Sequence, residues 1–224
     1  MAVSSSFFHL ASFALSGALV AAAPLAPAAV LDFSGNICSN SSGGICNDGS
    51  LISSDYGDIA GVLDVQYSNL SGNPTLTELR YWRNDYSDLV DVAWTDGGDF
   101  VSRAEIFLKP LDGSLITLNG FDLGAWPDTQ RTTSFSILDG NGTLLTDSGG
   151  IITVGIQPGN FHSSFTFSGI SSASGIRIQW GPSAYNVGID NIDFTVSAVP
   201  LPAPVWLLGS AMVALAARRR GLRD

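Results

Sequence analysis

Ile176-Arg-Ile-Gln-Trp180 and Val187-Gly-Ile-Asp-Asn-Ile-Asp-Phe-Thr-Val196 carry the pattern that decides the fold. Apolar and polar side chains alternate in them with period two, which is typical of β-strands with one buried face. Similar short runs recur along the chain between segments rich in Gly, Asn, Asp, Ser and Pro. These runs are Leu63–Tyr67, Leu76–Trp82, Val90–Trp94, Arg103–Leu108, Leu115–Phe121, Phe135–Ile137, Thr143–Thr146, Ile151–Ile156 and Phe165–Phe167.

About eleven short strands without a segment of helical period predict an all-β fold. Asp139-Gly-Asn-Gly142 lies between two of the runs and is a strong hairpin signal. We expect an antiparallel β-sandwich or jelly roll, with an up-and-down barrel as the alternative.

The last run contains an irregularity, because its alternation slips by one residue at Asp190-Asn191. A β-bulge produces such a slip and re-aims side chains. The bulge is either structural or presents oxygen ligands to a calcium ion, which takes six to eight oxygens. The predicted calcium ligands are Asp190, Asn191 and Asp193, with Asp32 brought close from the start of the domain.

Both ends of the chain predict export. Residues 7–23 are largely apolar and lead to Ala26-Pro-Ala28, a small-x-small cleavage pattern, so residues 1–28 read as a secretory signal peptide. Residues 1–20 contain no Lys or Arg, whereas a signal peptide normally begins with a positive region, so the sequence does not fix the position of the true start codon.

At the other end of the chain, Leu201 to Ala217 is uncharged and followed by arginines. As a helix these seventeen residues span about 26 Å, just short of a bilayer core. The arginines would hold the C-terminus inside and place the domain outside.

The tail from residue 198 to 224 resembles the PEP-CTERM sorting signal of Gram-negative bacteria. The resemblance rests on a proline motif, on Trp206-Leu-Leu-Gly-Ser210 and on an arginine cluster, with Leu201 where the family's name-giving motif has Glu. The motif residues are Val199, Pro200, Leu201, Pro202, Arg218, Arg219 and Arg220. The resemblance implies transient insertion in the inner membrane, processing by an exosortase-type membrane protease-transpeptidase, and delivery to the cell surface or extracellular matrix. An ordinary C-terminal membrane anchor is the alternative.

Leu118–Trp126, Gly175–Trp180 and Val187–Phe194 resemble jelly-roll domains found ahead of such tails, which are distantly similar to galactose-binding-type carbohydrate modules. This resemblance implies fold more than ligand.

Residues 29–197 then form one domain with six basic and nineteen acidic residues, a net charge of −13. This charge excludes nucleic acid as a partner, because phosphate binding needs clustered Lys and Arg.

Cys38 and Cys46 enclose a short glycine-containing segment and, in an exported chain, predict a disulfide. A zinc site needs two more ligands, and His162 is the only histidine in the domain.

The residues argue against catalysis. A histidine-dependent active site would have to use His162, in a loop. Glu78 and Glu105 lie near basic residues and favour cross-strand ion pairs over a glycosidase pair. The acidic segment Asp85–Asp99 reads as a solvated loop.

We therefore expect an exported, non-catalytic surface or matrix protein, associated with exopolysaccharide. A jelly-roll carbohydrate-binding module and a secreted hydrolase are the alternatives. The candidate platforms for stacking a sugar are Trp82, Trp94, Trp126 and Trp180. Trp94 and Trp180 are in phase with core residues, and Trp126, in a loop, is the predicted ligand contact.

Overall fold

The computed structural model describes residues 28–198, apart from 40–45, 74, 157 and 160. All regular elements in this part are β-strands, and it contains no helix long and apolar enough to span a membrane. Strand β1 starts at Ala28, the last residue of the predicted signal peptide. The rest of that peptide and the sorting motif from Val199 to Arg220 lie outside the described residues.

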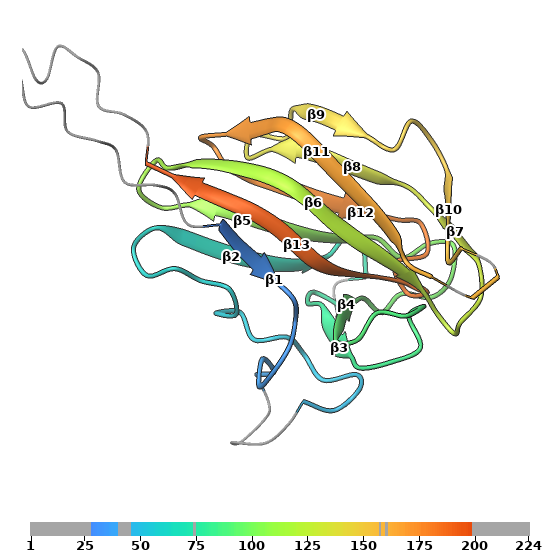
Figure 1. Cartoon of the computed structure of the whole chain (residues 1–224). Helices are drawn as coiled ribbons and strands as arrows, with labels where there is room; N and C mark the ends of the chain where they lie inside the picture. Colours follow the sequence, from blue (N-terminus) through green and yellow to red (C-terminus); the bar gives the residue numbers. More distant parts are fainter. Residues whose placement is uncertain (1–27, 40–45, 74, 157, 160, 199–224) are drawn as a thin grey trace, which may run out of the picture.

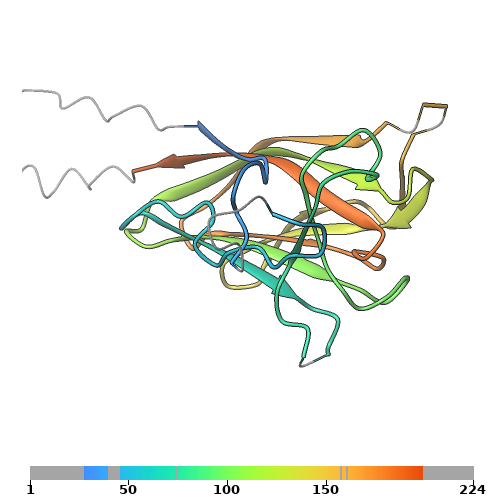
Figure 2. The same cartoon turned by 90° about the horizontal axis from the view of Figure 1, so that it is seen from below.

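Two antiparallel sheets form two packed layers (Figures 1 and 2). The first, here called the β6–β13 sheet, has the order β11-β6-β13-β4-β3, with β1 also paired to β13. Its strands are β1 (Ala28–Leu31), β3 (Arg80–Trp82), β4 (Val92–Trp94), β6 (Leu115–Ala125), β11 (Ser163–Ser172) and β13 (Val187–Ser197).

The second layer, the β5–β12 sheet, has the order β2-β5-β12-β8-β9. It consists of β2 (Leu63–Asn69), β5 (Ala104–Pro110), β8 (Phe135–Asp139), β9 (Leu144–Asp147) and β12 (Ile176–Trp180), while β7 (Arg131–Thr133) and β10 (Ile152–Val154) form a separate pair. The prediction of an antiparallel two-sheet β fold is confirmed.

The core lies between the two sheets and is built by the period-two residues. Ile116, Leu118 and Phe194 from one sheet and Ile106 and Ile178 from the other are fully buried in one hydrophobic cluster. Burying such a side chain contributes about 1.5–3 kcal/mol, so the alternation in the sequence is also the main source of stability.

The predicted hairpin forms between β8 and β9. Asp139 N–H donates to Thr143 O and Gly142 N–H to Asp139 O. The Asp139 carboxylate accepts further bonds from the N–H groups of Asn141 and Thr143. Gly142 has a φ of 87°, the left-handed conformation that favours glycine. Strands β1 and β7 were not predicted.

Strand β13 contains the predicted bulge, and β6 contains a second bulge that compensates for it. Along β13, Asp193 lies three positions after Asp190, whereas their partners on β6, Gly120 and Asp122, are two positions apart. The next step reverses this, because Phe194 follows Asp193 directly while its partner Leu118 lies two residues from Gly120. The pairing thus regains its original register beyond the two bulges.

The extra residues of these bulges are both asparagines. Asn191 has a positive φ of 50°, and Asn119 donates from its side-chain amide to Asp193 Oδ1 and Thr195 Oγ1. The bulge on β6 was not predicted, although the apolar residues of this strand change phase between Leu118 and Phe121.

Cys38 and Cys46 form a disulfide, as predicted, with their Cα atoms 5.6 Å apart. Both side chains are buried and belong to the main core cluster. Both cysteines belong to the segment before β2, so the bond links two parts of that segment, and the buried sulfur atoms pack it against the core.

Replacing both cysteines, Cys38→Ser with Cys46→Ser, should lower the free energy of unfolding by about 2–3 kcal/mol, because the unfolded chain regains the entropy of a loop of about nine residues. Urea unfolding measures the loss. Reductant should destabilise the wild-type domain and leave the double variant unchanged; equal unfolding midpoints of wild-type protein with and without reductant would contradict the prediction.

Candidate functional site

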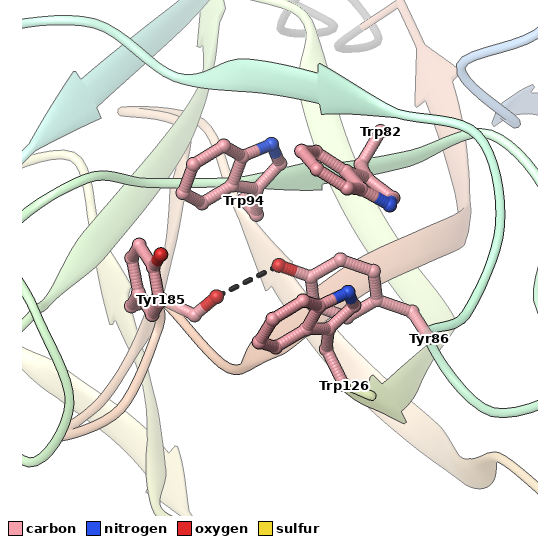
Figure 3. Close-up of a pocket in the computed structure, with 5 residues that line it drawn as sticks. All are labelled: Trp82, Tyr86, Trp94, Trp126 and Tyr185. Atoms are coloured by element: carbon pink, nitrogen blue, oxygen red, sulfur yellow. Dashed lines mark hydrogen bonds between the residues drawn. The ribbon is translucent and has the colours of Figure 1, made fainter. Parts of the chain in front are cut away.

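Five aromatic side chains surround a pocket of about 200 Å³ at one end of the sandwich (Figure 3). Trp82 comes from β3, Trp94 from β4 and Trp126 from the turn after β6. Tyr86 lies in the loop between β3 and β4, and Tyr185 in the connection between β12 and β13. The pocket therefore joins residues that are up to 103 positions apart in the sequence.

Strand pairing places the first two rings. In the β3–β4 pair Trp82 lies opposite Val92 and Trp94 opposite Arg80, so both indoles project from the same face. Their ring centroids are 5.8 Å apart and the planes are nearly perpendicular, at 87°. This is the edge-to-face arrangement that aromatic quadrupoles favour.

Two glycines allow the Tyr86 loop to lie directly on the β6–β13 sheet. A Cβ atom at Gly124 would be 2.2 Å from the carbonyl oxygen of Tyr86, and one at Gly188 would be 2.9 Å from its ring. The loop is fixed there by two bonds between Ser87 and Ala125, one from each backbone N–H. Glycine on the outer face of β6 and β13 is thus a requirement for the pocket.

Trp126 is held through its backbone. Its N–H donates to Asn186 O at 2.9 Å, and its carbonyl accepts from Arg131 Nε at 2.7 Å. The indole packs edge-to-face against Trp82 at 6.3 Å and Tyr185 at 6.4 Å. The perpendicular rings enclose a hollow instead of closing it by stacking.

The pocket has a buried base and a half-exposed rim. Tyr86 and Trp94 are only 2% and 6% exposed, whereas Trp82, Trp126 and Tyr185 are half-buried. The polar groups of the base are used internally: Tyr86 OH donates to Tyr185 O at 2.7 Å, the bond drawn in Figure 3, and Trp94 Nε1 donates to Tyr81 O.

The hydrogen-bond donors of the three rim side chains remain available to a ligand. Within the part of the chain that the structure describes, the indole N–H groups of Trp82 and Trp126 and the hydroxyl of Tyr185 make no hydrogen bond. Burial raises the pKa of Tyr86 well above its usual value, and Tyr185 and Asp96 add to this. The base is therefore neutral, and the pocket offers apolar ring surface with a few neutral donors.

The predicted loop position of Trp126 and the predicted core positions of Trp94 and Trp180 are correct. Trp180 is 2% exposed, donates to Val187 O and takes no part in the pocket. Sequence reasoning missed Tyr86 and Tyr185, which had no distinguishing pattern around them.

The predicted calcium ligands are only partly brought together. Asp190 is 3% exposed, and Asn191 donates to Asp122 Oδ2, a residue that the sequence analysis did not name. Asp193 instead accepts from Asn119, and Asp32 from Ser34 and Tyr56. Among the described residues, no group of three or more His, Cys, Asp or Glu side chains is arranged to hold a metal. Calcium binding remains a prediction.

The acidic segment 85–99 was expected to be a solvated loop, but it contains β4, and three of its carboxylates form ion pairs with arginines. Asp96 pairs with Arg80, Asp99 with Arg131 and Asp91 with Arg83. Asp88 accepts from both the backbone N–H and the ring Nδ1 of His162, at 2.7 and 2.8 Å. Glu105 pairs across strands with Arg177 at 2.6 Å, as expected of a cross-strand ion pair.

No protein-family model and no curated protein matches the chain. Among solved structures, the enzymatically active domain of tailspike protein 4 from bacteriophage CBA120 aligns with 74% of this chain and 21% of its own, at 13% identity and a TM-score of 0.33. The chain thus spans about a fifth of that protein's length. A similarity at this level carries no argument about function.

Asp190 should make stability depend on pH. Burial raises the pKa of its carboxyl to about 8, with Asp32, Asp122 and Asp91 adding to the effect against the bond from Asn191 N–H. In the unfolded chain the group releases its proton near pH 3.8. Between these values the folded state holds one proton more, so its stability is full at low pH and is lost as pH rises towards 8, by at most about 1.4 kcal/mol per unit.

Asp190→Asn should remove this loss, so urea unfolding should show the variant more stable than wild type at pH 8 and with no such advantage at pH 4. Asp193→Asn removes the same charge from the same strand and is the control. Parallel pH curves for wild type and Asp190→Asn would show that Asp190 does not carry the dependence.

The predicted calcium site is tested by the same variant. At pH 8, calcium should stabilise wild type relative to chelator, because it binds only the folded state, and Asp190→Asn should abolish that effect. Equal stability of wild type in calcium and in chelator would contradict calcium binding.

Proposed function

We propose that this protein is an exported, non-catalytic component of the cell surface or extracellular matrix that binds a saccharide in the aromatic pocket. The observation that carries the proposal is the set of half-buried rings of Trp82, Trp126 and Tyr185 around a hollow with neutral donors. Sugar rings present C–H faces that pack on aromatic surfaces and hydroxyls that need hydrogen-bond partners, and Trp and Tyr supply both.

The size of the pocket favours a small part of a glycan. The hollow between the rings is far smaller than the roughly 300–1,000 Å³ of sites that enclose drug-sized ligands. The rim rings can therefore contact one sugar ring or a chain end at the surface but cannot enclose it, and the remaining units would lie along the surface.

The strand order supports a sandwich of jelly-roll type. From β4 to β13 the chain repeatedly crosses between the six-stranded and the five-stranded sheet. Jelly rolls are double sheets with such crossings, usually of eight strands, and include lectin domains. This supports the family expectation and does not by itself specify a ligand.

The position of the chain ends fits presentation of the pocket away from an anchor. Strand β1 runs antiparallel to the end of β13, with Ala28 opposite Thr195, so the two ends of the domain lie side by side (Figure 1). The pocket residue Tyr185 lies just before the start of β13, and Ser197 at its end. Eleven strand residues span roughly 36 Å, so a domain held through the tail would point the pocket outwards.

Export rests on the signal-peptide and sorting-signal patterns together with the disulfide, which persists in oxidising compartments outside the cytosol. The proline motif at Val199–Pro202 and the arginines at 218–220 would then direct processing by an exosortase-type enzyme.

Trp126→Ala should weaken glycan binding at least about tenfold, because it removes one rim ring and its indole donor. A glycan array with the domain 29–197 identifies the ligand, and titration calorimetry measures the change. Phe161→Ala removes a 53%-exposed aromatic ring outside the pocket and should leave affinity unchanged. Absence of binding to every neutral and acidic glycan, or equal affinity of the Trp126 variant, would contradict the proposal.

The mature protein recovered from the cell exterior should lack Arg218 to Asp224, because processing occurs near the proline motif. Intact-mass spectrometry measures this. Replacing Arg218, Arg219 and Arg220 by Ala should leave unprocessed chain in the membrane fraction. Surface-exposed mature protein that retains the arginines would identify the tail as a plain anchor.

A further inference from the structure

One cation in the domain has no acidic partner. Acidic residues outnumber basic ones about three to one, and five of the six basic side chains in the described part of the chain form ion pairs. The sixth is Arg103, whose guanidinium makes neither an ion pair nor a hydrogen bond with any described residue. In so acidic a surface, an unpaired guanidinium is a feature to be explained.

The backbone fixes where this side chain starts. Arg103 directly precedes β5, its N–H donates to Ser71 Oγ, and its carbonyl accepts from Leu70 N–H at 2.8 Å. Its aliphatic stem lies against Gly181, where a Cβ atom would come within 2.7 Å of Arg103 Cγ. The absence of a side chain at 181 thus makes room for the arginine.

Arg103 borders a second hollow, of about 330 Å³, at one end of the β5–β12 sheet. Its apolar lining comes from Leu70, which is exposed, and from Phe135 and Trp180, which are almost fully buried. Ser136 and Gln179 are neighbours in register between β8 and β12.

Two further polar groups of this hollow are open to a ligand. Gln179 donates one N–H to Glu105 Oε2 at 2.6 Å, which orients the amide and leaves its other N–H and its oxygen. The Ser136 hydroxyl has no partner among the described residues. The hollow therefore combines a positive charge, an amide, a hydroxyl and apolar surface.

We propose that Arg103, Ser136 and Gln179 form a subsite for an acidic sugar, with the guanidinium binding the carboxylate of a hexuronic acid unit. A guanidinium matches a carboxylate with two parallel hydrogen bonds, and Ser136 and Gln179 suit ring hydroxyls. The net charge of −13 opposes anions in general, the uronate included, so binding requires the contacts of the sugar ring in addition to the charge pair.

The subsite is connected to the aromatic pocket through one short stretch of backbone. The connection between β12 and β13 contributes Gly181 to the second hollow and Tyr185 to the first. Ser102, next to Arg103, accepts from Tyr185 N–H through Oγ and from Ala184 N–H through its carbonyl. The inference rests on the proposed saccharide binding and adds a class of ligand, a uronate-containing polysaccharide.

The test is titration calorimetry of the domain 29–197 with a galacturonic or glucuronic acid oligosaccharide and with the same oligosaccharide after reduction of its carboxyl groups. Arg103→Gln should lower affinity for the acidic form at least tenfold and leave the reduced form unchanged, and Arg103→Lys should fall between. Lys109→Gln, which removes an equal charge from β5, the strand that Arg103 directly precedes, is the control and should retain wild-type affinity. Unchanged melting temperatures establish that the variants are folded.

Two results would overturn the subsite: equal affinity of wild type for the acidic and reduced forms, or equal affinity of Arg103→Gln and wild type for the acidic form. If neutral glycans still bind and Trp126→Ala weakens them, the aromatic pocket stands and only the Arg103 assignment fails. Absence of binding to any saccharide would end both proposals.

Discussion

The pairing of β13 with β6 is the constraint on which the rest of the structure depends. These two eleven-residue strands lie in the middle of their sheet and present buried side chains over most of their length. Strands β1 and β4 both pair with β13 on its other edge, and β11 pairs with β6. The register of this one pair therefore fixes the two ends of the described domain, Ala28 and Ser197, at one end of the sandwich and the aromatic loops at the other.

Local sequence patterns predict much of this sandwich, because period-two alternation and turn chemistry are local properties. The run at Ile176–Trp180 coincides with β12, and the Asp139–Gly142 hairpin and the Cys38–Cys46 disulfide form as expected. Strand β1 is short and only its last residue is buried, so it carries no alternation to detect. Strand β7 consists of one Arg and two Thr and pairs only with β10, so its sequence shows no alternation that would predict a strand.

The candidate site was harder to predict because its members are assembled by pairing, not by sequence proximity. Phase with neighbouring apolar residues correctly marked Trp94 as core and left Trp126 as a loop residue. Tyr86 could be found only by knowing that its loop folds onto Gly124 of β6 and Gly188 of β13, which are distant from it in the sequence. Asp122 faces Asp190 through the β6–β13 register, which no local pattern reveals.

The two compensating bulges also restrict how the length of the chain can change. Asn119 and Asn191 are the extra residues on opposite sides of one pairing, so each is tolerated because the other restores the register. Losing one asparagine alone would shift one end of the pairing by a residue and turn buried side chains such as Phe194 towards solvent. Insertions and deletions in β6 and β13 should therefore accumulate among relatives as matched pairs, and a homologue lacking one bulge should lack both.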